Sequence, residues 1–182
     1  MPLQKIIDQQ KKEINELTLL GIWNASKFKY HNASKINKIK RMQVNQGEVW
    51  YCDLGYNVGT EKNKSRPVLV ISNNKINRSG KVVVLCLTKA QGKTNQQDLP
   101  DQDSWYLLYS NTNIESQKLR PNRPIIQGNI PYNFLDRDSL VQCEEVRSIS
   151  KSRLDQGRRC IGRLTPKDIS NIKKKFLRTY DF

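Results

Sequence analysis

The chain has 182 residues, with 32 Lys and Arg against 17 Asp and Glu, and a formal net charge of +15. This length suits one compact domain with an appendage, and no apolar stretch approaches the roughly 20 residues that span a bilayer. The charge favours a polyanionic partner, nucleic acid before a membrane surface, although a basic protein without such a partner is the simpler alternative.

Residues 1–43 differ in composition from the rest and are predicted to form a helical extension followed by a connector. Apolar residues recur at spacings of three, four or seven from Leu3 to Leu17, which predicts an amphipathic helix. This helix either docks on its own domain or grips a partner. Asn, Lys and Ser dominate residues 24–46, which favours an irregular or partly helical connector. The start, MPLQKIIDQQKKE, lacks the apolar core of a signal peptide, so we expect a cytoplasmic protein.

From Gly47 onward the pattern is that of short strands. Five runs rich in Val, Ile, Leu, Trp and Tyr follow one another: GEVWYCDL, RPVLVISN, KVVVLCLT, SWYLLY and DSLVQCEEV. This spacing predicts a mainly β fold, either a small barrel or a strongly curved sheet. A helix follows near the C-terminus, with Thr165 as its cap and Pro166 in its first turn. Its apolar face is expected to cover an open side of the barrel.

The long polar stretch 89–136 interrupts the strand pattern. Loops of this size in a compact domain are usually functional or mobile. Its cations are candidates for a nucleic-acid path, although a solvated face explains them nearly as well: Lys93, Lys118, Arg120 and Arg123.

Cys52, Cys86 and Cys143 sit in strand-like runs and are predicted to be reduced core residues. With Cys160 they are the four cysteines of the chain. They stand far apart with no CxxC pair and no His at ligand spacing, so neither a zinc site nor a redox motif is expected.

Most familiar hydrolytic arrangements are missing from the sequence. His31 is the only histidine and lies in the predicted connector, which argues against a His-dependent triad or a two-histidine acid/base pair. Neither GxxxxGK nor GxGxxG occurs, and the acidic residues are too scattered for a two-metal nuclease. An enzyme acting on nucleic acid is therefore expected to work without metal or other cofactor.

Polar residues do remain at strand ends, where a rigid backbone can hold side chains in a shared site. Six of them stand there: Glu61, Arg66, Thr88, Glu145, Arg147 and Ser148. Each also has an ordinary interpretation, such as a surface cation for Arg66, a strand former for Thr88 and a salt-bridge partner for Arg147.

Four segments together resemble the MazF/PemK family of toxins from bacterial toxin–antitoxin pairs, whose members are sequence-specific endoribonucleases. They are QGEVWYCDLGYNVGTEKNKSRPVLVISNN, GKVVVLCLTKA, DSLVQCEEVRSISKSRL and IGRLTPKDISNIKKKFL. The first is the most specific, because a G-[ST]-E loop with Arg-Pro five residues after the Glu is uncommon elsewhere. The resemblance implies a toxin domain over residues 44–182 with an insertion at 89–136. The extension before Val44 has no counterpart in the short family members.

The resemblance also assigns roles to individual residues. The family's catalytic Arg and Thr fall on Arg66 and Thr88, and its loop acid falls on Glu61. Substrate contacts are implied for Ser65, Asn73, Lys89, Glu145, Arg147 and Ser148. Relatives commonly carry Gln at position 145 and Thr at position 148, and these departures bear on base preference rather than on the catalytic pair. No metal site is implied.

Fold, assembly and mechanism follow from the same resemblance. It implies an SH3-like small β-barrel with a C-terminal helix, a homodimer, and a groove that binds either single-stranded RNA or an acidic antitoxin. The ribose 2′-hydroxyl would attack the adjacent phosphorus, giving a 2′,3′-cyclic phosphate and a 5′-hydroxyl. Arg66 would offset charge on the phosphoryl group and Thr88 would donate a hydrogen bond. The general base stays open: arginine side chains in general stay protonated, which conflicts with the family role as a base, and Glu61 is the chemical alternative.

Two other functions fit the same barrel. A CcdB-type relative poisons DNA gyrase, although that activity does not need the Arg66 and Thr88 match. A non-cleaving RNA-binding barrel would instead use stacking aromatics, for which the candidates are Trp105, Tyr106, Tyr109 and Tyr132.

Overall fold

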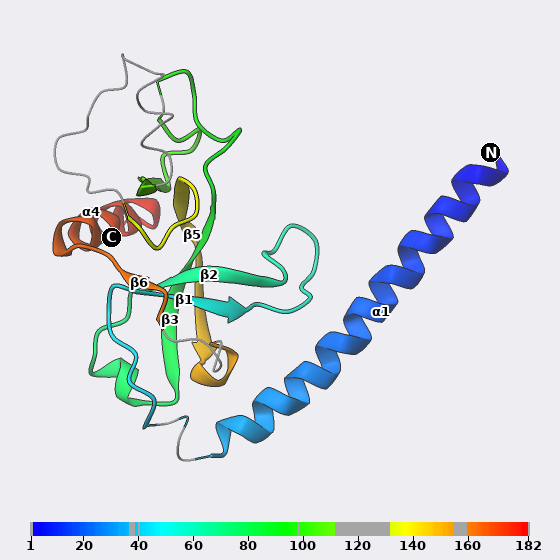
Figure 1. Ribbon diagram of the computed structural model, residues 1–182, viewed down its shortest axis with the longest axis horizontal. Helices are drawn as coiled ribbons and strands as arrows, with labels where there is room; N and C mark the ends of the chain where they lie inside the picture. The colour runs from blue at the N-terminus through cyan, green and yellow to red at the C-terminus, as the bar shows by residue number, and fades with distance from the viewer. Residues whose placement is uncertain are drawn as a thin grey trace.

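The computed structural model describes residues 2–36, 39, 41–97, 99–111, 132–154 and 160–181. Within them, six strands form one antiparallel sheet in the order β4-β5-β3-β2-β1-β6, flanked by helices α1 and α4 (Figure 1). The helices are α1 (Leu3–Ser34) and α4 (Pro166–Thr179), with short 3-10 turns η1 (Ile76–Arg78) and η3 (Lys151–Arg153). The strands are β1 (Glu48–Asp53), β2 (Ser65–Val70), β3 (Lys81–Lys89), β4 (Trp105–Leu108), β5 (Ser139–Ser150) and β6 (Gly162–Arg163). The predicted mainly β fold with a C-terminal helix and an N-terminal helical extension is confirmed.

A large bulge in β5 gives the sheet its curl. Leu85 of β3 pairs with Val146, but the next residue, Cys86, pairs with Gln142, so residues 143–145 bulge out of the ladder. Such bulges bend a strand and increase its twist. The first part of β5 therefore pairs with both β3 and β4, while its second part continues along β3 alone. The result is a half-barrel with β4 and β6 as its edges.

Apolar side chains fill both faces of this curled sheet, as expected when successive strand residues point to opposite sides. One face buries Val68, Val84 and Cys86 together with Leu154. The other buries residues such as Leu69, Leu85 and Val141 under α4, whose Ile172 is 1% exposed.

The predicted cap of the C-terminal helix is confirmed. Thr165 accepts a hydrogen bond on its side chain from the backbone N–H of Asp168 (3.2 Å), and Pro166 is the first helical residue. This arrangement satisfies one of the unpaired N–H groups at the helix start.

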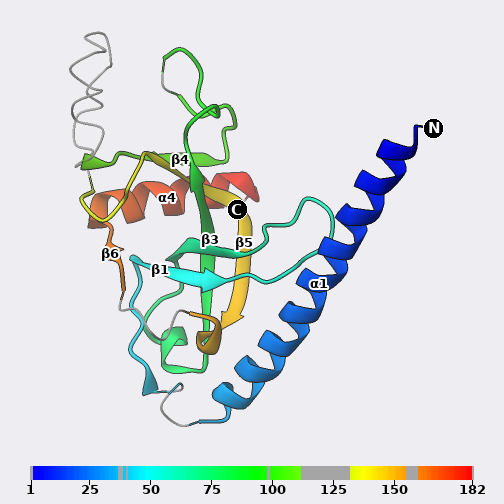
Figure 2. The same ribbon diagram turned by 45° about the vertical axis from the view of Figure 1, so that its right-hand side comes forward.

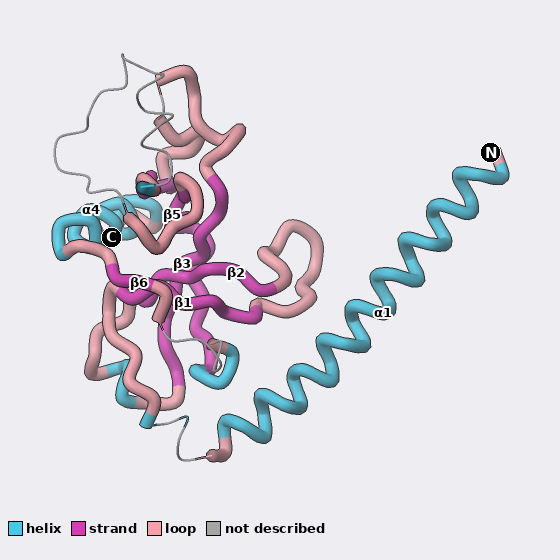
Figure 3. Tube along the Cα trace, viewed as in Figure 1, coloured by secondary structure: helices cyan, strands magenta, loops and turns pink. Residues whose placement is uncertain are grey.

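The first helix is longer than the sequence pattern predicts. The connector predicted to be irregular or partly helical over residues 24–46 is helical as far as Ser34, because α1 runs without a break to that residue (Figure 3). Tertiary contacts of the second half of α1, above all those of Trp23 and Tyr30, stabilise helix where Asn and Ser are weak helix formers. The first half extends away from the sheet and exposes Leu3 and Leu17.

Cys52, Cys86 and Cys143 are buried free thiols, as predicted, and Cys160 is a half-buried free thiol. The two-residue strand β6 was not foreseen, because Gly162–Arg163 carries no apolar alternation. Among the helices that the structure describes, none has both the length and the apolar character needed to cross a bilayer.

Candidate active site

The loop of residues 54–64 joins β1 to β2 and places Arg66 at its end. Its root closes by two backbone hydrogen bonds, from Leu54 to the carbonyl of Lys64 (3.0 Å) and from Lys64 to the carbonyl of Gly55 (2.7 Å). Lys64 has a φ of 67°, a left-handed conformation that is costly for a residue with a side chain. The side-chain amide of Asn57 donates to the carbonyls of Leu54 and Lys62, which ties the two limbs together. The loop is thus closed by hydrogen bonds between its own two limbs.

Arg66 begins the rigid part of β2. It pairs with Cys52 of β1, and its Nε donates a 2.7 Å hydrogen bond to the carbonyl of Asn63 in the loop. The half-buried side chain is therefore oriented by the loop and carries further N–H donors on its two Nη atoms.

The buried hydroxyl of Thr88, near the end of β3, is held by a lysine from the following turn. Lys93 Nζ donates to Thr88 Oγ1 over 2.9 Å and lies 5.7 Å from the centroid of the Trp105 ring. Burial, together with the positive charges of Lys62, Arg66 and Lys89, lowers the pKa of Lys93. Val68 of β2 pairs with Cys86 of β3; Arg66 stands two residues before Val68 and Thr88 two residues after Cys86, so both side chains point to the same face of neighbouring strands.

A charged row from β5 and the loop borders this place. Arg147 Nη2 lies 3.7 Å from Glu61 Oε2 and 3.6 Å from Glu145 Oε2. Glu145 is the last residue of the bulge in β5, and regular pairing with β3 resumes after it, so Glu145 lies two residues before Arg147. Glu61, Arg66, Thr88, Lys93, Glu145 and Arg147 are called the Arg66–Thr88 cluster below.

The buried Cys86 connects the two halves of the Arg66–Thr88 cluster. Burial raises the pKa of its thiol to about 11, while the guanidinium of Arg147 opposes the rise and the carboxylate of Glu145 adds to it. Arg66 also acts on the same thiol. Cys86 stands two residues before Thr88, so both point to the same face of β3. The cluster therefore covers one face of the sheet.

Four residues with predicted substrate contacts lie elsewhere. Ser65, Lys89 and Ser148 are exposed and each stands next to a cluster residue in its strand, so each points to the opposite face of the sheet. Asn73 follows the far end of β2, on the order of 20 Å from Arg66 for an extended chain. Its Oδ1 accepts hydrogen bonds from the backbone N–H groups of Lys75 and Ile76 (3.0 Å each). The structure does not bring Asn73 to the cluster.

Sequence reasoning missed the contact between Lys93 and Thr88. The sequence marked Lys93 only as one of four cations in a polar stretch, and Lys118, Arg120 and Arg123 lie outside the described residues. A Lys five residues after a candidate Thr, across a turn with Gly92, was the available signal. Gln142, which pairs with Trp105 of β4, is 2% exposed, and its Oε1 accepts no hydrogen bond from the described residues.

The candidate stacking aromatics are mostly buried. Trp105, Tyr109 and Tyr132 are 8%, 7% and 7% exposed, and Tyr106 donates from its hydroxyl to Asp168 Oδ1 (2.6 Å). A base-stacking platform needs exposed ring faces, which these three buried rings do not offer. No group of three or more His, Cys, Asp or Glu residues with the geometry to hold a metal ion occurs in the described ranges.

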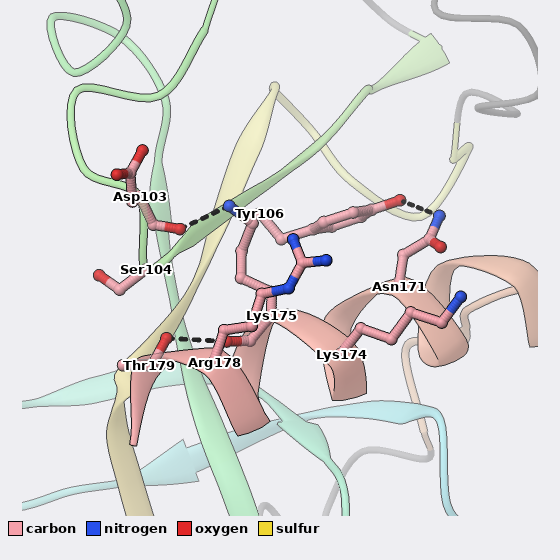
Figure 4. A pocket seen from close by; sticks show the side chains of 8 residues that line it. All are labelled: Asp103, Ser104, Tyr106, Asn171, Lys174, Lys175, Arg178 and Thr179. Carbon is pink, nitrogen blue, oxygen red and sulfur yellow. Dashed lines mark hydrogen bonds between the residues drawn. The ribbon is translucent and has the colours of Figure 1, made fainter. Parts of the chain in front are cut away.

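A separate hollow lies between β4 and α4 (Figure 4). It is lined by Asp103, Ser104, Tyr106, Asn171, Lys174, Lys175, Arg178 and Thr179. Tyr106 points to the face of β4 opposite Trp105, so this hollow belongs to the α4 side of the sheet and not to the Arg66–Thr88 cluster.

Comparison with known families places the chain. The model of the PemK-like, MazF-like toxin of type II toxin-antitoxin systems matches residues 45–179. The chain belongs to this family. The predicted MazF/PemK toxin is thereby confirmed.

Individual proteins are similar to this chain. The endoribonuclease EndoA of Bacillus subtilis (strain 168) is 32% identical over 113 residues, which is 62% of this chain and 76% of the relative. Among solved structures, an endoribonuclease in complex with its cognate antitoxin from a mycobacterial species is 20% identical, with a TM-score of 0.49 over 77% of this chain and 97% of that one. MazF from Deinococcus radiodurans is 15% identical, with a TM-score of 0.49 over 78% and 99% of the two chains.

Proposed function

We propose that this MazF/PemK toxin is a metal-independent endoribonuclease that cuts single-stranded mRNA at specific sequences in the cytoplasm. The observation that carries the proposal is the hydrogen bond of Lys93 to Thr88 on the face of the sheet to which Arg66 also points. Three groups suited to a phosphate, two cations and a hydroxyl, therefore share one site. The family match and the name of the B. subtilis relative support the same enzyme class.

Arg66 and Thr88 stabilise the phosphoryl group in this mechanism. An arginine guanidinium is a cation that carries only hydrogen-bond donors, so the role of Arg66 is electrostatic. Thr88 Oγ1 already accepts the hydrogen bond from Lys93, which leaves its own hydrogen to be donated to a phosphoryl oxygen. Lys93 thus orients the hydroxyl and adds positive charge.

The chemical step exchanges one phosphorus–oxygen bond for another. The 2′-oxygen bonds to phosphorus, the bond between phosphorus and the 5′-oxygen breaks, and a 2′,3′-cyclic phosphate forms. The 2′-hydroxyl gives its proton to a base, for which we assign Glu61, and the 5′-oxygen takes a proton from water. Glu61 is suited to this role because its carboxylate is 58% exposed and is held near the site by Arg147. DNA, which lacks the 2′-hydroxyl, is not cut.

An acidic antitoxin is the proposed protein partner. The net charge of +15 attracts RNA and an acidic polypeptide by the same long-range force, so the antitoxin competes with RNA for one groove. A homodimer that forms this groove is part of the proposal, as is the division of the chain into an extension of residues 1–43 and a toxin domain of residues 44–182.

The test is to incubate the purified protein with a long unstructured RNA and the matching DNA in excess EDTA, and to map the RNA ends. The proposal requires discrete cuts in RNA only, with 5′-hydroxyl and cyclic phosphate ends. Cleavage that stops in EDTA would contradict metal independence. No cleavage, together with gyrase inhibition, would favour a CcdB-type function. RNA binding without cleavage would favour a binding module, which the buried aromatics disfavour.

A further inference from the structure

The second half of α1 packs against the root of the loop that carries Glu61. Trp23 is the one buried side chain among the described residues of α1, with 7% of its surface exposed. Its ring covers Gly55, the residue that opens the loop after Leu54: a Cβ placed on Gly55 would lie 2.2 Å from the Trp23 ring. Gly55 also has a φ of 84°, so both its conformation and its neighbour require glycine.

Polar contacts fix the same junction. Tyr30, two turns further along α1, donates from its hydroxyl to Asp53 Oδ2 (2.7 Å), and Asp53 Oδ1 accepts from the backbone N–H of Gly55 (3.0 Å). Burial and this hydrogen bond to Asp53 raise the pKa of Tyr30 above its usual range. Arg153 of η3 donates from Nε to the Asp53 carbonyl (2.8 Å) and lies 5.1 Å from the Trp23 ring centroid. α1, the end of β1 and η3 therefore meet at one point.

A continuous set of contacts leads from this point to Arg66. The carbonyl of Gly55 accepts from Lys64, and the backbone N–H of Asn57 donates to Asn63 Oδ1 (2.7 Å). The carbonyl of Asn63 then accepts from Arg66 Nε (2.7 Å). The same loop carries Glu61 to Arg147. Figure 2 shows the loop between β1 and β2 directed toward α1.

We propose that α1 is an intramolecular support for the catalytic loop, with Trp23 and Tyr30 as positioning residues for Arg66 and Glu61. The inference rests on the proposed ribonuclease function for its effect on catalysis, but not for its effect on the loop. The supporting residues precede the segment that matches the family model, which begins at residue 45. The loop of this chain thus depends on a segment outside the matched toxin domain.

The attachment of α1 at this junction depends on a few side chains around Trp23. Lys27 and Arg153 both lie within cation–π distance of Trp23, at 5.5 and 5.1 Å from its ring centroid. Outside this contact the described part of α1 is mostly exposed, so the junction concentrates its attachment in a few side chains. Local units with few buried contacts open at low free energy, so removing one of these side chains is expected to free the loop without unfolding the sheet.

The test compares full-length Trp23→Ala and Tyr30→Phe with the control Leu17→Ala, whose side chain on the same helix is 68% exposed. Hydrogen exchange followed by mass spectrometry reports the loop, residues 54–64, separately from β3. We expect exchange in the loop to rise about tenfold in Trp23→Ala and less in Tyr30→Phe, with β3 unchanged. We expect kcat for RNA cleavage to fall at least about tenfold in Trp23→Ala with little change in KM, because misplaced catalytic groups lose rate rather than binding.

The two readouts separate this inference from the proposed function. Loop exchange unchanged in both variants would overturn the support, whatever the RNA assay shows. Faster loop exchange with normal cleavage would overturn the role of the support in catalysis. If the wild type does not cleave RNA at all, the proposed function fails, while the exchange data still decide whether α1 holds the loop. If Trp23→Ala unfolds as a whole, Tyr30→Phe, which removes one hydroxyl, decides by the same measurements.

Discussion

Lys93 donates a hydrogen bond from Nζ to Thr88 Oγ1 across the turn that follows β3. The backbone of Lys93 is fixed on both sides, since its N–H donates to the carbonyl of Ala90 (2.9 Å) and its carbonyl accepts from Asp101 (3.0 Å). The ammonium therefore reaches Thr88 from a defined position. This pairing makes Thr88 a directed hydrogen-bond donor, which an isolated hydroxyl on a strand would not be.

If Lys93 acts through Thr88, the effects of substituting the two residues on kcat are not additive. We expect Thr88→Val and Lys93→Met each to lower kcat by about 10²-fold, and the double variant to lose little more than the worse single one. Single-turnover cleavage of a short RNA measures all three. Lys81→Met, which removes an exposed cation at the other end of β3, is the control and should stay within about threefold of the wild type. Multiplying losses in the double variant would show that Lys93 acts independently of Thr88.

The lowered pKa of Lys93 predicts an alkaline limit to cleavage. Below its pKa Lys93 is an ammonium that donates to Thr88; above it, the neutral amine accepts the Thr88 hydrogen that the proposed mechanism gives to the phosphate. Activity should therefore fall as pH rises, and at a lower pH than an unperturbed Lys pKa near 10.5 would give. Lys93→Arg keeps its charge and should move this alkaline fall in activity to higher pH. The measurement is kcat/KM against pH for both proteins, and coincident alkaline limbs would contradict the assignment.

The sequence predicts the strands better than the site. Runs such as KVVVLCLT and RPVLVISN carry their own β signal, and Arg66 and Thr88 stand at their ends, so a rigid scaffold for them was predictable. The five-residue spacing alone did not predict the contact of Lys93 with Thr88, because Lys93 reaches Thr88 through a turn whose path depends on packing. The bulge of residues 143–145 likewise escapes the sequence, since nothing in DSLVQCEEV marks where the pairing with β3 slips.

The docking of α1 is a second feature that the sequence does not predict. The spacing of Leu3 to Leu17 predicts a helix, but the side chain that attaches it is Trp23, just before the segment expected to be irregular or partly helical. Trp23 matters because Gly55, far away in sequence, offers a surface without a Cβ. Such a pair is visible only after folding.

Asn73 is predicted to serve the turn and not the substrate. Its Oδ1 caps the backbone N–H groups of Lys75 and Ile76 beyond the far end of β2. We expect Asn73→Ala to lower the free energy of unfolding by about 1 kcal/mol, as loss of a capping side chain does. Cleavage of RNA should stay at the wild-type rate. A large loss of kcat or of RNA affinity with unchanged stability would indicate that Asn73 contacts the substrate after all.

Asp168 is predicted to be the main polar anchor of α4. Its carboxylate is 1% exposed and accepts hydrogen bonds from the hydroxyls of Tyr106 (2.6 Å), Thr165 (2.9 Å) and Tyr132. Asp168→Ala leaves these hydroxyls without their acceptor, so we expect a loss of about 3 kcal/mol or more in the free energy of unfolding in urea. The exposed Asp101 is the matched control, and Asp101→Ala should change stability by less than about 0.5 kcal/mol. Equal stabilities of the two variants would contradict the anchor.

The most direct test of the ribonuclease site is the comparison of Arg66→Ala with Arg78→Ala. Arg66 lies at the start of β2 and belongs to the Arg66–Thr88 cluster, whereas Arg78 is an exposed Arg in η1 beyond the other end of β2. Single-turnover cleavage and RNA affinity are measured for both in EDTA. We expect Arg66→Ala to lose cleavage by about 10²- to 10³-fold while its RNA affinity changes by less than about tenfold, and Arg78→Ala to match the wild type. Full cleavage by Arg66→Ala, or equal losses in the two variants, would contradict the assignment of Arg66 to the scissile phosphate.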